Sequence, residues 1–148
     1  MYKTISMLIV LIIMIGCSDE SLSGQKPPIA TIEIGNEEYR TTLGTYCWKN
    51  TCADAVGPFE MLKGKTPIHV RSGETISLNI DYKPKPNKFH LVQIVDENKK
   101  EVPLKDNQFT APQKQGVYYY SYGVWWKDEQ KKNGSHGSAF YAFVLKVD

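Results

Sequence analysis

The sequence has no concentrated block of either charge. Its 148 residues include 18 Lys and Arg against 16 Asp and Glu, and the formal net charge is +2 at pH 7. Proteins that bind nucleic acid carry clustered basic side chains that neutralise successive phosphates. Because no such cluster occurs along the sequence, we expect no nucleic-acid partner.

The short motifs that carry catalysis or hold a metal are also missing. His69, His90 and His136 show neither HxH nor HExxH spacing. No GxSxG segment surrounds a serine, and no glycine-rich phosphate loop precedes a predicted helix. Such motifs place a nucleophile, a metal or a phosphate where the chemistry requires it. We therefore predict no catalytic residue, no metal site and no cofactor, and we do not expect an enzyme.

No apolar run in the sequence reaches membrane-spanning length. The longest, residues 5–15, follows a single basic residue, Lys3, and is closed by Gly16. A helix needs about 20 apolar residues to cross the hydrocarbon core of a bilayer. A short apolar run between a positive start and a small residue is typical of a secretory signal peptide. We predict that residues 1–16 are a cleaved signal peptide.

The end of this segment resembles the lipobox of bacterial prolipoproteins. Met14, Ile15, Gly16 and Cys17 match it, with Met in place of the usual Leu. The resemblance implies that the Cys17 thiol carries diacylglycerol and that Cys17 becomes the first mature residue. Each buried acyl methylene contributes about 0.8 kcal/mol to membrane binding. We expect a protein anchored by lipid to the extracytoplasmic face of the cell membrane. An ordinary signal peptide with an incidental cysteine is the alternative.

Cysteine is scarce, with three residues in the chain. If Cys17 carries lipid, Cys47 and Cys52 remain as an even pair in a compartment where disulfides persist. A bridge across this short loop would stabilise the fold by about 2 kcal/mol in the chain-entropy model. We predict the Cys47–Cys52 disulfide. A redox-active or metal-handling pair is the alternative, although redox motifs usually have CxxC spacing.

The chain after the signal peptide divides into a linker and one domain. Residues 18–28, SDESLSGQKPP, are polar and lack periodic apolar positions, which is typical of a flexible linker. We predict the lipidated cysteine and a flexible tether over residues 17–28. Residues 29–148 are enough for one domain with a real core.

No segment of ten or more residues shows helical periodicity, whereas strand alternation is frequent. Ile76, Leu78 and Ile80 alternate with polar residues, and two aromatic segments, 117–126 and 138–147, read as long strands. We predict an all-β domain, a two-sheet antiparallel sandwich of seven to nine strands. A closed barrel or a jelly roll is the alternative.

Two segments resemble known families. Gly116, Tyr118 and Tyr120 match the entry into strand F of Ig-like domains, with Tyr118 at the tyrosine-corner position. This resemblance implies an Ig-like sandwich without the core disulfide. The block YCW…CAD over residues 46–54 resembles small Gram-positive lipoproteins of uncharacterised function. That resemblance implies a fold and a cellular location but no activity.

Five residues form the candidate binding patch. Trp48 lies within the disulfide loop, Tyr46 and Asp54 lie on either side of it, and Trp125 and Trp126 are adjacent on a predicted strand. Adjacent strand residues point to opposite faces, so one of these two tryptophans should be exposed. A cross-linked aromatic loop suits recognition of a protein, a peptide or cell-wall material, because little side-chain entropy remains to be lost. The same loop could instead plug one end of the sandwich core.

Overall fold

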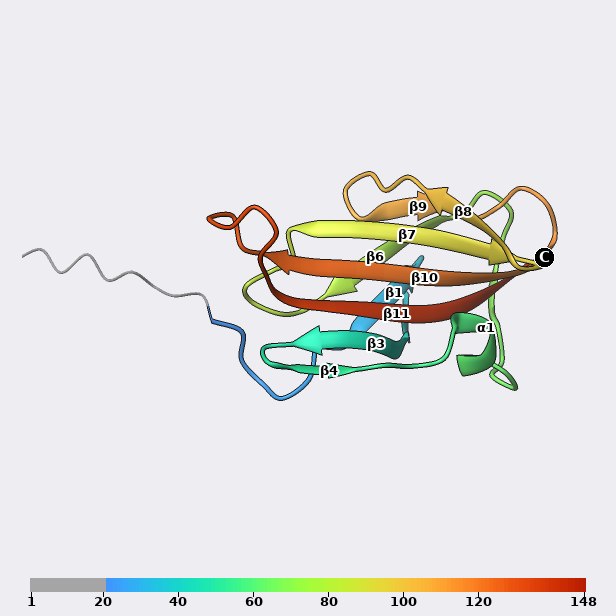
Figure 1. Cartoon of the computed structure of the whole chain (residues 1–148). Coiled ribbons are helices and arrows are strands. Elements are labelled where there is room, and N and C mark those ends of the chain that lie inside the picture. The colour runs from blue at the N-terminus through green and yellow to red at the C-terminus, as the bar shows by residue number, and fades with distance from the viewer. Residues whose placement is uncertain (1–20) are drawn as a thin grey trace, which may run out of the picture.

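The computed structural model describes residues 21–148, which form two sheets packed face to face (Figure 1). The smaller sheet has the order β2-β1-β6-β9 and consists of β1 (Ala30–Ile34), β2 (Glu37–Arg40), β6 (Thr75–Ile80) and β9 (Gln108–Thr110). The larger sheet has the order β4-β3-β11-β10-β7-β8, with β5 paired in parallel to β11. Its strands are β3 (Thr42–Trp48), β4 (Thr51–Ala53), β5 (Ile68–Val70), β7 (Lys88–Val95), β8 (Asn98–Val102), β10 (Gly116–Lys127) and β11 (Ser135–Val147). The predicted signal peptide and Cys17 lie outside the described residues.

The strand order is Ig-like, with an added hairpin. β1, β6 and β9 share one sheet, whereas β7, β8, β10 and β11 share the other. Tyr118 forms the predicted tyrosine corner, because its hydroxyl donates to the Lys114 carbonyl at 2.7 Å. The prediction of an all-β, two-sheet sandwich is confirmed.

The predicted number of strands, seven to nine, is wrong, because the described residues contain eleven. Residues 38–43 do not form one continuous strand, because the chain leaves the smaller sheet at Thr41. The Thr41 hydroxyl donates to the Ala30 carbonyl at 2.6 Å and holds this bend. β2 ends before the bend and β3 begins after it in the larger sheet. The hairpin of β3 and β4 therefore extends the larger sheet beyond β11.

Strand alternation decides which side chains fill the space between the sheets. Tyr120 stacks on Phe143 with ring centroids 4.9 Å apart, at the position where antibody domains have a core cysteine. Aromatic side chains bury about 150–250 Å² each and so supply much of the core. The inward residues of β10 and β11 are all buried: Tyr118, Tyr120, Tyr122, Val124, Trp126, Ala139, Tyr141, Phe143, Leu145 and Val147.

The segment predicted as a flexible tether is ordered against the domain from Leu22 onward. Leu22 is 6% exposed and belongs to the core. The Ser23 amide donates to the Tyr82 hydroxyl at 2.7 Å, and the Pro28 carbonyl accepts from the Tyr141 hydroxyl at 2.6 Å. The prediction of a tether reaching residue 28 is therefore wrong for residues 22–28, because an apolar side chain within the polar run finds a place in the core.

One short helix covers part of the larger sheet on its outer face, the face turned away from the smaller sheet. α1 (Pro58–Met61) begins after Gly57 with a proline at its first position, where no amide hydrogen is needed. Leu62, next to α1, packs on Ala142 and Val144 of β11. No helix within residues 21–148 is long and apolar enough to span a membrane.

Candidate functional site

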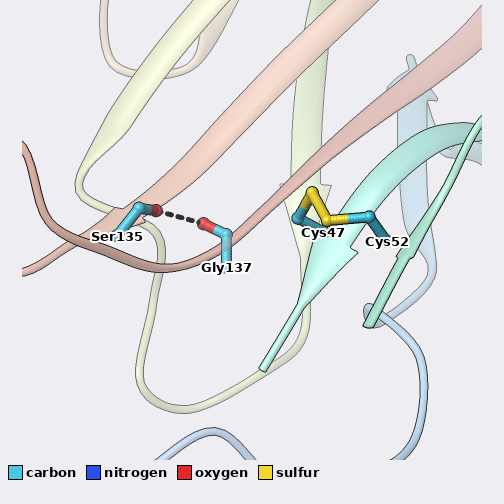
Figure 2. The surroundings of a disulfide bond; sticks show 4 residues. All are labelled: Cys47, Cys52, Ser135 and Gly137. Carbon is cyan, nitrogen blue, oxygen red and sulfur yellow. Dashed lines mark hydrogen bonds between the residues drawn. A yellow bond between two sulfur atoms is a disulfide. The ribbon is translucent and has the colours of Figure 1, made fainter. Parts of the chain in front are cut away.

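The predicted Cys47–Cys52 disulfide is confirmed (Figure 2). The two residues lie directly opposite each other on β3 and β4, with Cα atoms 4.0 Å apart. β4 is the edge of the larger sheet, and Cys52 is exposed there. In the adjoining β11, the Ser135 hydroxyl donates to the Gly137 carbonyl at 2.8 Å (Figure 2). The bridge thus joins a short edge strand to the body of the sheet.

Trp48, next to this bridge, is a core residue that is 1% exposed. Its ring packs edge-on against Trp126, with centroids 4.8 Å apart, and against Tyr82 at 5.6 Å. Its indole N–H donates to the Ser23 carbonyl at 3.3 Å. We call Leu22, Trp48, Tyr82 and Trp126 the end cap. Trp48 thus fills one end of the core, as expected for a plug, whereas residues 49–52 of the disulfide loop are exposed.

The predicted exposed patch containing Trp48 with Trp125 or Trp126 is wrong. Trp126 is 3% exposed, and its indole N–H donates to the Pro84 carbonyl at 2.7 Å. Trp48 of β3 and Trp126 of β10 both belong to the core, at inward positions of the two strands that flank β11. Trp125 points to the opposite face, as the alternation predicted, and is half-buried there.

The other two patch residues are not brought together with Trp125 either. Tyr46 is half-buried and packs against the core. Asp54 is exposed after the end of β4. The five candidate residues are thus divided between the core, the sheet edge and the outer face.

An apolar hollow on the outer face, which we call the outer-face hollow, is the strongest candidate site. Its volume is about 320 Å³, and it lies between the segment 55–61 and Phe140. Its base is formed by the small side chains of Ser121 and Ala142, which pair across β10 and β11. Val56 stands at its wall with 63% of its surface exposed. Nearly all of these groups are apolar, so the hollow is suited to burying an apolar group of a ligand rather than to catalysing a reaction.

A β-bulge shapes the hollow. Leu43 pairs with Tyr141 and Tyr46 with Ala139, so two residues of β3 face the single residue Phe140. Such a bulge bends the strand and redirects side chains. The Thr45 hydroxyl accepts the Ala55 amide hydrogen at 3.0 Å and fixes the wall segment to the bulge.

Aromatic rings extend the apolar surface from the hollow along the outer face. Phe140 packs edge-on against Trp125, with centroids 5.4 Å apart. A Cβ atom at Gly123 would lie 2.8 Å from the Phe140 ring and 2.9 Å from the Trp125 ring, so only glycine lets the two rings close over the strand. On the other side, Phe59 is 54% exposed and packs on Tyr119.

Sequence reasoning missed Val56, Phe59 and Phe140, although a signal was present. In β11, Phe140, Ala142 and Val144 alternate with the inward residues and are themselves apolar. A strand that is apolar on both faces is covered on both faces or exposes an apolar surface. The apolar outer face of β11 was therefore the sequence signal that other parts of the chain pack on this face and that a hollow lies there.

The histidines are all exposed or half-buried beside carboxylates. His69 lies 2.5 Å from Asp148, and this hydrogen bond lowers the pKa of the Asp148 carboxyl. His90 lies 3.2 Å from Glu101, and the imidazole of His136 lies 3.9 Å from Asp128. Within the described part of the chain, no group of three or more His, Cys, Asp or Glu side chains could hold a metal ion.

No protein-family description, curated protein or solved structure matches this chain. The candidate function therefore depends on the geometry of the outer-face hollow and on the chemistry of residues 1–17. The hollow has the concave shape and the apolar lining that are typical of binding sites.

Proposed function

We propose that this protein is a lipid-anchored lipoprotein of the extracytoplasmic membrane face. Its domain is a non-catalytic binding module that takes an apolar peptide segment of a protein partner into the outer-face hollow. The positive start, the short apolar run and Cys17 support the anchor. The Cys47–Cys52 bridge supports an oxidising compartment.

The observation that carries the proposal is the exposure of apolar side chains around a hollow that apolar groups also line. Val56 and Phe59 are 63% and 54% exposed. Burying a side chain of valine size contributes about 1.5 kcal/mol or more, so a partner that covers this surface gains affinity. Apolar side chains inserted into such hollows are typical centres of protein interfaces.

A peptide fits the hollow better than a sugar does. A sugar needs hydrogen-bond partners for its hydroxyls and an open aromatic face for stacking. Ser121 supplies a hydroxyl at the base, but that of Thr45 is already bonded to Ala55. The Trp125 ring is not an open stacking surface, because the Lys88 ammonium lies 5.5 Å from its centroid and the Phe140 ring packs against Trp125. An apolar side chain needs neither kind of contact.

Panning a phage-displayed random peptide library on the mature chain, residues 17–148, tests this proposal. We expect wild-type protein to enrich peptides that contain a large aliphatic or aromatic residue. Val56→Asp places a charge on the wall and should weaken the binding of those peptides by at least about tenfold, which corresponds to the burial of one such side chain.

Ile29→Asp is the matched control, because Ile29 is 55% exposed and does not line the hollow. This variant should bind the enriched peptides like wild type. Failure to enrich apolar peptides, or an equal loss in both variants, would contradict the proposal. If the protein instead binds a cell-wall polysaccharide, and only Val56→Asp loses that binding, the ligand of the hollow is a glycan and not a peptide.

A redox role of Cys47 and Cys52 is the second candidate, because Cys52 is exposed and a reductant can reach the bridge. Equilibration with glutathione buffers distinguishes the two roles. A reduction potential below about −300 mV is typical of a structural disulfide, whereas a value above about −230 mV favours a redox function.

A further inference from the structure

The described chain begins at one end of the sandwich, where three loops also lie (Figure 1). The Lys49 amide donates to the His136 carbonyl at 3.2 Å, which joins the β3–β4 turn to the β10–β11 loop. The Asn87 side chain donates to the Lys127 carbonyl at 3.0 Å and joins the β6–β7 connection to the same loop. We call this region the N-terminal end. It comprises Leu22, the turn at residues 49–50, the segment 81–88 and the loop 127–136.

Lysine dominates the N-terminal end. Three carboxylates lie there, and the Asp128 carboxylate already accepts the Gln130 amide hydrogen at 3.0 Å. None of the lysines in this region forms a salt bridge within residues 21–148. With Asp19 and Glu20 of the tether added, the lysines still outnumber the acids. The lysines are Lys49, Lys83, Lys85, Lys88, Lys127, Lys131 and Lys132, and the carboxylates are Asp81, Asp128 and Glu129.

The opposite end differs because acidic and basic side chains are nearly balanced there. Its acids are Glu37, Glu38, Glu60, Glu74, Asp96, Glu97 and Asp148, and its bases are Lys63, Lys65, Arg71, Lys99, Lys114 and Lys146. Arg71 lies 3.2 Å from Glu74, and the ammonium of Lys146 lies 3.7 Å from Asp148, which also bonds His69. An excess of positive over negative charge is thus concentrated at the end where the chain leaves toward Cys17.

The covalent distance between this end and Cys17 is short. Leu22 is buried in the end cap and follows Cys17 by five residues. Five residues span at most about 18 Å when fully extended. A lipid on Cys17 therefore holds these lysines close to the bilayer surface, where the attraction of anionic headgroups acts over about 8 Å at physiological ionic strength.

We propose that the N-terminal end docks on anionic phospholipid headgroups, so that the sandwich stands upright with β10 and β11 along the membrane normal. This inference rests on the proposed lipid anchor. The anchor supplies the affinity, and the lysines set the orientation, because a tethered surface meets the headgroups at high effective concentration. The opposite end, whose acidic and basic side chains nearly balance, then faces away from the bilayer.

Fluorescence quenching by headgroup-labelled lipid tests the orientation. Residues 17–148 are coupled through the Cys17 thiol to a maleimide phospholipid in phosphatidylcholine vesicles, with and without phosphatidylglycerol. A fluorescent amino acid replaces Asn133 in the loop or Asn36 in the β1–β2 turn at the opposite end. β11, with 13 residues, spans about 40 Å between these ends. We expect phosphatidylglycerol to raise quenching at Asn133 several-fold above that at Asn36, and high salt to remove the difference.

Charge reversal supplies the matched comparison. Lys83→Glu, Lys85→Glu, Lys131→Glu and Lys132→Glu together should abolish the preference for Asn133. The same change at four exposed lysines elsewhere should leave it intact: Lys63, Lys99, Lys100 and Lys114. Equal quenching at both positions, or insensitivity to phosphatidylglycerol or to the first set of substitutions, would overturn the proposal.

The anchor itself is checked separately by mass spectrometry of the protein purified from its own membrane. Absence of lipid on Cys17 would contradict the proposed function. The chemically coupled protein would still report whether the N-terminal end binds anionic headgroups, so the two failures are distinguishable.

Discussion

At the scale of single residues, the three tryptophans show how one residue type serves two environments. Trp48 and Trp126 form part of the end cap, with both indole N–H groups bonded to backbone carbonyls. Trp125 precedes Trp126 on β10, so its side chain points to the opposite face of the sheet, where it packs on Phe140. Side-chain alternation, rather than composition, decides which of them contributes to the core.

Trp48→Ala and Trp125→Ala should therefore differ in stability. Removing the buried Trp48 ring leaves a cavity and should lower the free energy of unfolding by about 3–5 kcal/mol. Removing half-buried Trp125 should cost about 1 kcal/mol. Urea denaturation followed by circular dichroism measures both, and losses of equal size would contradict the assignment of Trp48 to the core.

Gly137 is a second sensitive residue, because the chain packs closely there. A Cβ atom at this position would lie 2.8 Å from both the Leu22 methyl and the Trp48 ring. Gly137→Ala should lower the free energy of unfolding by about 1–3 kcal/mol through overpacking. Gly57→Ala is the control, since no atom lies within 4 Å of its Cβ position, and it should change stability by less than about 0.5 kcal/mol.

At the scale of elements, the edge hairpin depends on its disulfide more than on its length. β4 has three residues and pairs only with β3 in the described chain. A strand this short gains little from its own ladder, so the covalent link to Cys47 and the bond between Thr45 and Ala55 hold the wall of the hollow.

Replacing both Cys47 and Cys52 by Ala should lower the free energy of unfolding by about 2 kcal/mol without abolishing the fold. Peptide binding by the hollow should weaken as well, because its wall becomes mobile before binding. Reduction of wild-type protein with dithiothreitol should produce the same loss. Unchanged stability and unchanged peptide binding in the double variant would show that the bridge does not hold the wall of the hollow in place.

Elements were predictable where a single local pattern decided them. The alternation of Ile76 and Leu78 and the Gly116, Tyr118, Tyr120 spacing predicted β6 and the start of β10 correctly. The bend at Thr41 was not predictable, because it depends on a hydrogen bond to Ala30 in another strand. The outer-face hollow was predictable only in part. The alternation in β11 indicated a second apolar face, but segment 55–61 meets β11 only after folding.

At the scale of the whole molecule, the core is built around tyrosines that must stay neutral. Burial raises the pKa of Tyr120, Tyr122 and Tyr141 above the ordinary value of about 10. The Tyr120 hydroxyl nevertheless donates to the Gln93 side chain, and the Tyr141 hydroxyl donates to the Pro28 carbonyl. A phenolate in this core would lack the water that stabilises it.

Stability should therefore fall in alkali. The folded state holds these three protons more tightly than the unfolded state, so the stabilisation is present below about pH 10 and is lost as the pH rises above it. Phenolate absorbance should show one group of tyrosines that titrates reversibly near pH 10 and a second group that titrates only with unfolding. Titration of every tyrosine near pH 10 in folded protein would contradict the buried arrangement.

The docking of Leu22 also limits where the domain can search for a partner. A flexible tether of 12 residues, the length predicted from the sequence, has a root-mean-square span of about 19 Å. A tether of five residues, the number from Cys17 to Leu22, has a span of about 12 Å. The volume that the domain can reach scales with the cube of this span, so the shorter tether reduces that volume to about a quarter. With the proposed lipid on Cys17, a domain on so short a tether would meet molecules at its own height above the bilayer far more often than molecules farther from it. Under the proposed anchor, the burial of Leu22 would thereby favour a partner attached to the same membrane.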